Sequence, residues 1–201
     1  MRTLRLGGLV LCAWLALVSS NASAAGAADT VRTLYSTLMN IMQNGSRLGP
    51  SGRYNQMAAI VPRVFDVPYM SRLAVGPQWD SLSDAERRQI SDAFVRYIAA
   101  TYAERFDKYE GEQLQVQGEQ GAAGGTMVTS QIIKSNGEPV HINYLMHQSG
   151  GGWVIADVYL NGTISELATR RSEFGSILRS QGVPGLIAAL NNKAAVLARS
   201  G

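Results

Sequence analysis

Residues 153–174, WVIADVYLNGTISELATRRSEF, decide the expected fold, because a strand, a tight turn and an amphipathic helix follow one another there. Alternation over residues 153–160 predicts a strand, and both faces of that strand are largely apolar. Asn161-Gly162 provides a chain reversal that tolerates positive φ, and Thr163 or Ser165 can cap the helix that follows. The apolar stripe of that helix is Ile164, Leu167, Ala168, Phe174, Ile177 and Leu178. We therefore expect a sheet that is covered on both faces.

The first 24 residues have the features of a secretory signal peptide. Arg2 and Arg5 precede an apolar run at residues 6–18, and Ala22-Ser23-Ala24 supplies the small residues of a cleavage site. The apolar run is shorter than the ~20 residues that span a bilayer, so a membrane anchor is the weaker interpretation. We expect cleavage after residue 24 and secretion of the remaining chain.

Residues 25–201 are nearly neutral and contain no cysteine. They hold 16 Lys and Arg (18 − 2) against 15 Asp and Glu, a net charge of +1, which gives no argument for nucleic-acid binding. Cys12 is the only cysteine in the sequence and lies in the predicted signal peptide, so no disulfide is expected. The region has no internal repeat and no low-complexity linker, and it is large enough to form a core without cross-links. It predicts one domain.

Residues 27–110 are expected to be helical, in several pieces. Ser83 and Glu86 form a capping box that opens the longest helix. Asp66 is placed to cap a short helix, whereas Pro62 must kink or end the helix before it. The expected helices are 27–44, 54–61, 66–75 and 83–110, with a polar loop at 46–52.

Residues 112–160 change to a period of two, which predicts a sheet. The glycine-rich residues 118–125 predict a loop, and Asn136-Gly137 predicts a tight turn. Residues 163–198 return to a helical pattern, with a new helix starting at Pro184. The expected strands, which form an antiparallel meander, are 113–117, 126–134, 140–147 and 153–160. The sequence therefore predicts an α+β fold, with about four antiparallel strands in a twisted sheet wrapped by six to seven helices.

Residues that could carry catalysis are few. His141 and His147 are the only histidines, and six residues along a strand separate them by ~20 Å, too far to share a metal. No nucleophile motif and no phosphate-binding loop occurs. Asp66 and Asp157 could act as an acid and a base, but each has a simpler role. Asp66 looks like a helix cap, and Asp157 is expected to accept a hydrogen bond from Arg170, Arg171 or a backbone donor. We expect no catalytic residue, metal or cofactor, and a hydrolase is the alternative.

Large apolar and aromatic side chains are abundant, and they allow two interpretations. They can fill an ordinary core, or the broken helices can leave an apolar cavity against the sheet. Periodicity does not separate these two. The candidate lining residues are Val61, Phe65, Met70, Leu73, Trp79, Phe94, Ile98, Tyr102, Tyr144, Met146, Trp153 and Ile155.

Several stretches together resemble the MlaC family of periplasmic lipid-binding proteins, also called the toluene-tolerance auxiliary family. The likeness covers nearly all of residues 25–201, and the stretches are Phe65-Asp66-Val67, Gly76-Pro77-Gln78-Trp79, the Ser83 helix with Tyr102, residues 153–158, and residues 161–165 with 170–174. The segment SELATRRSEF followed by ILRSQG is most similar to the hopanoid-associated HpnM branch. Thr169-Arg170-Arg171 departs from the aromatic-arginine pattern of many relatives, which leaves open whether cargo and partner are those of the phospholipid branch.

The resemblance implies a small twisted sheet of the nuclear-transport-factor-like cone type, with helices around an apolar cavity for lipid tails. It also implies a carrier of a hopanoid or related polycyclic lipid, with a glycerophospholipid as the second choice of cargo. This carrier would dock on an inner-membrane lipid transporter with transient membrane contact. An adaptor without a ligand is the alternative. Arg170 or Arg171 could hold a headgroup at the mouth, although pairing with Glu166 and Glu173 on the helix surface is the favoured role. Which face of the strand at 153–160 lines the cavity stays open.

Overall fold

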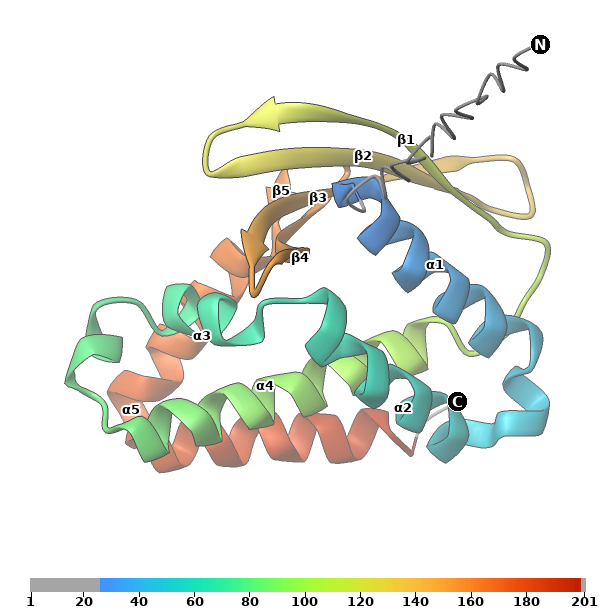
Figure 1. Cartoon of the computed structure of the whole chain (residues 1–201). Helices are drawn as coiled ribbons and strands as arrows, with labels where there is room; N and C mark the ends of the chain where they lie inside the picture. The colour runs from blue at the N-terminus through green and yellow to red at the C-terminus, as the bar shows by residue number, and fades with distance from the viewer. Residues whose placement is uncertain (1–25, 200–201) are drawn as a thin grey trace, which may run out of the picture.

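The computed structural model describes residues 26–199, and the predicted signal peptide lies outside them. A five-stranded antiparallel sheet in the order β1-β2-β3-β4-β5 lies above a layer of helices (Figure 1). The helices are α1 (Ala27–Gln43), α2 (Gly45–Val64), α3 (Val67–Val75), the 3-10 helix η1 (Gly76–Ser81), α4 (Asp84–Arg105) and α5 (Glu166–Leu197). The strands are β1 (Gln113–Ala122), β2 (Gly125–Ile133), β3 (Pro139–Ser149), β4 (Gly152–Leu160) and β5 (Ile164–Ser165). The predicted α+β class is confirmed.

Local start signals in the helical half are confirmed. The Asp66 side chain accepts a hydrogen bond from the Tyr69 N–H and begins α3. Ser83 and Glu86 form the expected capping box at the start of α4. These caps form because each satisfies backbone N–H groups that have no partner inside the helix. The helix α4 ends at Arg105, before the predicted end, and Trp79 lies in η1 rather than in a linker.

Two long helices each contain one residue outside helical geometry. Gly49 in α2 has φ 61° and ψ 178°, and Gly182 in α5 has φ 66° and ψ −170°. Glycine adopts these values without the steric cost of a Cβ, so each helix changes direction there and continues. The predicted loop at 46–52 is therefore wrong, because helix flanks Gly49 on both sides. Pro62 lies inside α2, two residues before its end.

The sheet is larger than predicted. Strands β1 and β2 continue through the glycine-rich residues that were expected to form a loop, down to the pair Ala122 and Gly125. A fifth strand, β5, follows the turn at Asn161-Gly162, where both residues have positive φ as expected. The helices gather on one side of the sheet (Figure 1), whereas His141, Asn143 and Leu145 on the opposite face of β3 are exposed or half-buried. The prediction of cover on both faces is wrong for most of the sheet.

A β-bulge in β4 decides which side chains face the helices. Tyr144 lies opposite Val158, but Met146 lies opposite Ile155, so the register shifts by one residue between these pairs. Because directly opposed residues point to the same face, Ile155 and Val158 both face the helices despite their odd spacing. The strict alternation predicted for residues 153–160 is therefore broken at Ala156.

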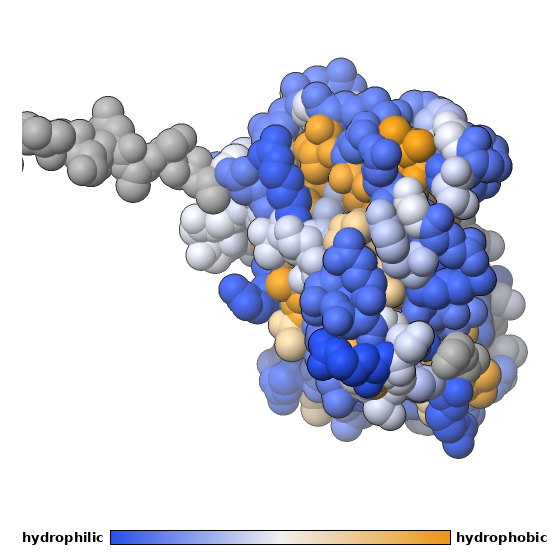
Figure 2. All heavy atoms as spheres, turned by 90° about the vertical axis from the view of Figure 1, so that its right-hand side faces the viewer, coloured by the Kyte–Doolittle hydropathy of each residue, from blue (hydrophilic) through white to orange (hydrophobic). Residues whose placement is uncertain are grey.

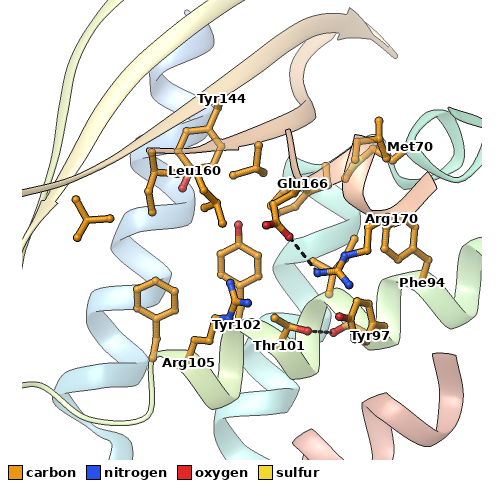
Figure 3. A pocket seen from close by; sticks show the side chains of 17 residues that line it. Met70, Phe94, Tyr97, Thr101, Tyr102, Arg105, Tyr144, Leu160, Glu166 and Arg170 are labelled. Atoms are coloured by element: carbon orange, nitrogen blue, oxygen red, sulfur yellow. Dashed lines mark hydrogen bonds and ion pairs between the residues drawn. The ribbon is translucent and has the colours of Figure 1, made fainter. Parts of the chain in front are cut away.

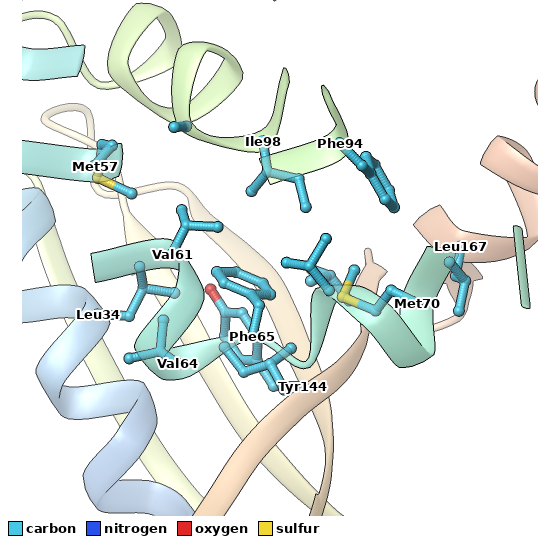
Figure 4. Packing of buried hydrophobic residues seen from close by; sticks show 14 of the residues in the cluster. Leu34, Met57, Val61, Val64, Phe65, Met70, Phe94, Ile98, Tyr144 and Leu167 are labelled. Atoms are coloured by element: carbon cyan, nitrogen blue, oxygen red, sulfur yellow. The ribbon is translucent and has the colours of Figure 1, made fainter. Parts of the chain in front are cut away.

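The core lies between the sheet and the helical layer. Leu34 of α1, Val61 of α2 and Tyr144 of β3 are each at most 1% exposed, and Figure 4 shows them packed around Phe65. The outer surface is mostly hydrophilic on the side shown in Figure 2, with apolar side chains gathered toward the sheet and in a gap beneath it.

Candidate functional site

An apolar cavity of about 280 Å³ lies between the sheet and helices α3, α4 and α5 (Figure 3). Its lining consists of Phe65, Met70, Phe94, Tyr97, Ile98, Thr101, Tyr102, Arg105, Phe106, Val140, Ile142, Tyr144, Val158, Leu160, Glu166, Leu167 and Arg170. This volume lies just below the ~300–1,000 Å³ that is usual for small-molecule sites. The lining is mostly aliphatic and aromatic, so the cavity suits an apolar ligand.

Helix α4 forms one wall because its lining residues recur at helical spacing. Phe94, Ile98 and Arg105 lie four and seven residues apart, which places them on one face. Ring contacts fix this wall: Phe94 meets Phe174 of α5 edge-on with centroids 5.3 Å apart, and Tyr102 stacks on Phe106 at 5.9 Å. Helix α5 packs against this wall through Phe174, and the lining residues of α4 extend over about three helical turns.

Strands β3 and β4 form the facing wall. Ile142 lies opposite Leu160, and Tyr144 lies opposite Val158, so these four side chains point to the same face of the sheet. Phe65 pairs with Ile155 through an isolated parallel bridge, and the Asp66 N–H donates to the Ile155 carbonyl at 2.9 Å. The backbone next to Phe65 thereby continues the sheet along the part of β4 that β5 leaves unpaired.

Tyr144 of the sheet wall and Tyr102 of α4 bring hydroxyl groups to the cavity, and Tyr35 of α1 packs against Tyr144. The hydroxyls of Tyr35 and Ser130 lie 2.6 Å apart, and Ser130 donates its proton to the Ile142 carbonyl, so Tyr35 is the donor to Ser130. The rings of Tyr35 and Tyr144 meet edge-on with centroids 6.0 Å apart. Burial raises the pKa of Tyr144 and of Tyr102 well above the usual value for a phenol. Both hydroxyls therefore stay neutral at neutral pH, so Tyr144 adds no charge to the sheet wall and Tyr102 adds none to the α4 wall.

One group of charged side chains at the cavity is centred on Arg170 of α5. Arg170 donates to Glu166 at 3.1 Å and to Glu173 at 2.7 Å, and its guanidinium lies 5.4 Å from the centre of the Tyr97 ring. Burial alone would lower the pKa of Arg170, but Tyr97 and the two carboxylates outweigh it and raise that pKa. Lys193 also pairs with Glu173. The predicted pairing of Arg170 with both glutamates is confirmed.

A family model for the MlaC protein matches residues 32–192, most of the sequence. The chain belongs to the MlaC family. It is also similar to the solved structure of a phospholipid-binding protein from Ralstonia solanacearum in complex with a phospholipid. That comparison has a TM-score of 0.71 at 24% identity and covers 87% of this chain and 99% of that one. At this identity the second match shows a shared fold.

Asp157 has a structural position in this MlaC-family protein. It is 7% exposed and accepts hydrogen bonds from the backbone N–H groups of Val158 and Leu167 and from the Ser165 hydroxyl. The predicted hydrogen bond from a backbone N–H to Asp157 is confirmed, whereas neither Arg170 nor Arg171 binds this carboxylate. Asp157 does not line the cavity. Its hydrogen bonds instead join β4 to the start of α5.

The two histidines lie apart, as expected. His141 is exposed. His147 is half-buried, with its Nε2 atom 3.0 Å from the Asp66 carboxylate and its ring 4.6 Å from that of Tyr69. Within residues 26–199, no three His, Cys, Asp or Glu side chains come together as metal ligands would, and no helix is long and apolar enough to cross a membrane.

Six of the twelve candidate lining residues meet at the cavity of this MlaC-family protein. These are Phe65, Met70, Phe94, Ile98, Tyr102 and Tyr144. Val61, Met146 and Ile155 instead lie fully buried in the core, because neighbouring side chains cover them. Leu73, Trp79 and Trp153 are half-buried and pack against the outside of that core. Those six do not line the cavity.

Several lining residues were not among the candidates. Thr101, Arg105 and Phe106 continue the stripe of α4, and Val140 and Ile142 continue the inward face of β3, so periodicity extended from Tyr102 and Tyr144 was the available signal. Val158 and Leu160 had no such signal, because the bulge sets their direction.

Proposed function

We propose that this protein is a periplasmic lipid carrier that holds the apolar part of one lipid in the cavity between α4 and the sheet. The observation that carries the proposal is the cavity itself, which has an uncharged wall on the sheet side and aliphatic and aromatic side chains over most of its surface. Membership of the MlaC family supports the lipid ligand and the periplasmic location. A carrier of this kind requires no nucleophile and no cofactor.

The physical reason for such a carrier is the cost of exposing a lipid tail to water. Each methylene moved from water into an apolar site gains ~0.8 kcal/mol, so a tail of about sixteen carbons represents on the order of 13 kcal/mol. A cavity whose affinity for the tail roughly matches that of the membrane removes this barrier. A cavity that bound the tail far more tightly than a bilayer would not release it.

Two lipid classes are candidates for the cargo. The resemblance to the HpnM branch favours a hopanoid, whereas the phospholipid bound to the Ralstonia protein favours a glycerophospholipid. The cavity has a volume of about 280 Å³. A flexible acyl chain can enter such a space and widen it through side-chain rotation, whereas rigid fused rings need the walls to move apart first. We therefore place the glycerophospholipid first.

Mass spectrometry of an organic extract from gently purified protein tests the proposal. We expect one lipid class in stoichiometric amount, with glycerophospholipid and hopanoid masses separating the two cargoes. A folded protein without lipid that takes none from labelled vesicles would exclude the carrier function.

The partner follows from the same reasoning. A carrier needs a donor and an acceptor, and an inner-membrane lipid transporter with transient membrane contact supplies one of them. An adaptor that binds this transporter with no ligand is the alternative function. A carrier needs the space beside Ile98 to admit a lipid, whereas an adaptor without a ligand does not need this space.

A further inference from the structure

Three charged side chains line the cavity, and they differ in how their charges are matched. Glu166 and Arg170 bind each other, and Arg170 also binds Glu173. Arg105 also lines the cavity, but no hydrogen bond or ion pair joins its side chain to any other residue between 26 and 199. Arg105 therefore leaves one positive charge unmatched at the cavity.

Arg105 also marks where the cavity meets solvent. Among the described residues, it is the one lining residue classed as exposed, whereas the others are buried or half-buried. It lies in the last turn of α4, and Figure 3 shows its side chain beside Tyr102 at the edge of the apolar lining. A lipid whose tail fills the cavity must leave its polar end where water is available, which places that end near Arg105.

Arg170 is the less suitable of the two arginines for an anion. Its side chain is 18% exposed and lies between two carboxylates, so an anionic group that approached it would meet Glu166 and Glu173 at short range. Like charges a few ångströms apart repel each other, and burial strengthens that repulsion. Lys193 is already paired with Glu173 as well.

We propose that Arg105 binds the anionic headgroup of the lipid held in the cavity and makes this protein select negatively charged lipids over zwitterionic ones. This inference rests on the proposed carrier function and deepens it. The guanidinium can donate two parallel hydrogen bonds to a phosphate, and its free charge supplies the attraction that a headgroup of net charge zero lacks. Selection at the mouth leaves the binding of the tail unchanged.

The test uses protein expressed from the full sequence and vesicles that contain equal parts of dioleoyl phosphatidylglycerol and dioleoyl phosphatidylcholine. Both lipids have the same tails, and the protein encounters both in the same bilayer. General attraction of the protein to an anionic surface therefore affects the uptake of both lipids equally. The quantity measured is the ratio of the two lipids bound per protein. The variants are Arg105→Gln, which removes the charge, and Arg105→Lys, which keeps it. Arg88→Gln is the matched control, because Arg88 is an exposed residue of α4 that does not line the cavity.

We expect wild type and Arg88→Gln to favour phosphatidylglycerol, and Arg105→Gln to reduce the ratio about two- to fivefold, as for loss of one exposed charge contact. Arg105→Lys should keep most of the preference, and added salt should weaken it in wild type. Glycerol phosphate at the lipid concentration should not displace the lipid, because the headgroup contact alone is weak.

An unchanged ratio in Arg105→Gln, or an equal ratio in wild type, would overturn this inference and leave the carrier function standing, since both lipids are still bound. Failure of wild type to bind either lipid would overturn both. Thermal melts of each variant separate loss of selection from loss of fold, and total bound lipid shows that the cavity is intact.

Discussion

The Oδ1 atom of Asp157 on β4 accepts a hydrogen bond from the Leu167 backbone N–H of α5 at 3.1 Å. This contact joins the last long strand to the first turn of the helix that carries Arg170. The same carboxylate accepts from Ser165, whose hydroxyl in turn caps the helix by accepting from the Ala168 N–H. One buried carboxylate thus fixes the direction in which α5 leaves the sheet.

Asp157→Asn should destabilise the protein, because the amide retains one acceptor oxygen and loses the charge that strengthens three hydrogen bonds. We expect the free energy of unfolding to fall by about 1–3 kcal/mol, measured by denaturant titration. Asp92→Asn on the exposed side of α4 is the control and should change it by less than about 0.5 kcal/mol. Unchanged stability with loss of a hydrolytic activity would favour the hydrolase interpretation instead.

Buried tyrosines should make the fold sensitive to alkaline pH. Burial raises the pKa of Tyr35, Tyr102 and Tyr144 above the ordinary value of 10.0. Above pH 10 the unfolded chain loses these protons while the folded protein retains them, so stability is full below pH 10 and falls as pH rises, by up to ~1.4 kcal/mol per pH unit for each group. Denaturant titrations between pH 8 and 11 measure the slope. Tyr144→Phe should make the slope shallower, and an unchanged slope would show that this hydroxyl has the same pKa in the folded and unfolded states.

Arg170→Gln should reduce stability through the pairs it breaks, unlike Arg105→Gln. Its partners Glu166 and Glu173 are 27% and 28% exposed, so we expect a loss of about 1–2 kcal/mol at neutral pH. Burial alone would raise the pKa of Glu173, but Lys193 and Arg170 outweigh it and lower that pKa. A lowered pKa contributes stability above the unfolded value of 4.5 and loses it in acid, so the difference from wild type should shrink below pH 4.5. A difference independent of pH would indicate lost packing alone.

Signals that act within a few residues of the chain were sufficient to predict their structures. The caps at Asp66 and Ser83 and the turn at Asn161-Gly162 each depend on contacts inside one turn, which the sequence displays directly. The α+β class follows from the change of period near residue 112. The stripe of α4 likewise indicated Phe94, Ile98 and Tyr102 as lining residues.

Features that depend on two distant segments could not be predicted this way. The bulge at Ala156 arises from the pairing of β4 with β3, and that pairing places Val158 and Leu160 on the face toward the cavity. Ile155 was a reasonable candidate by alternation, yet its partner across the bridge is Phe65, far earlier in the chain. The free charge of Arg105 is visible only when all its neighbours are placed.

The space beside Ile98 gives the test that separates a carrier from an adaptor with a solid core. Ile98 lines the cavity, whereas Ile90 on the same helix is fully buried and does not. Ile98→Trp should fill the cavity, keep the thermal melting temperature near wild type and abolish most lipid uptake from labelled vesicles. Ile90→Trp is the matched control and should cost about 1–3 kcal/mol of unfolding free energy, because a packed core has no room for the larger ring. If both substitutions destabilise the protein equally, the cavity closes in solution and the adaptor function is favoured. If Ile98→Trp folds normally and binds lipid like wild type, the lipid lies outside this cavity.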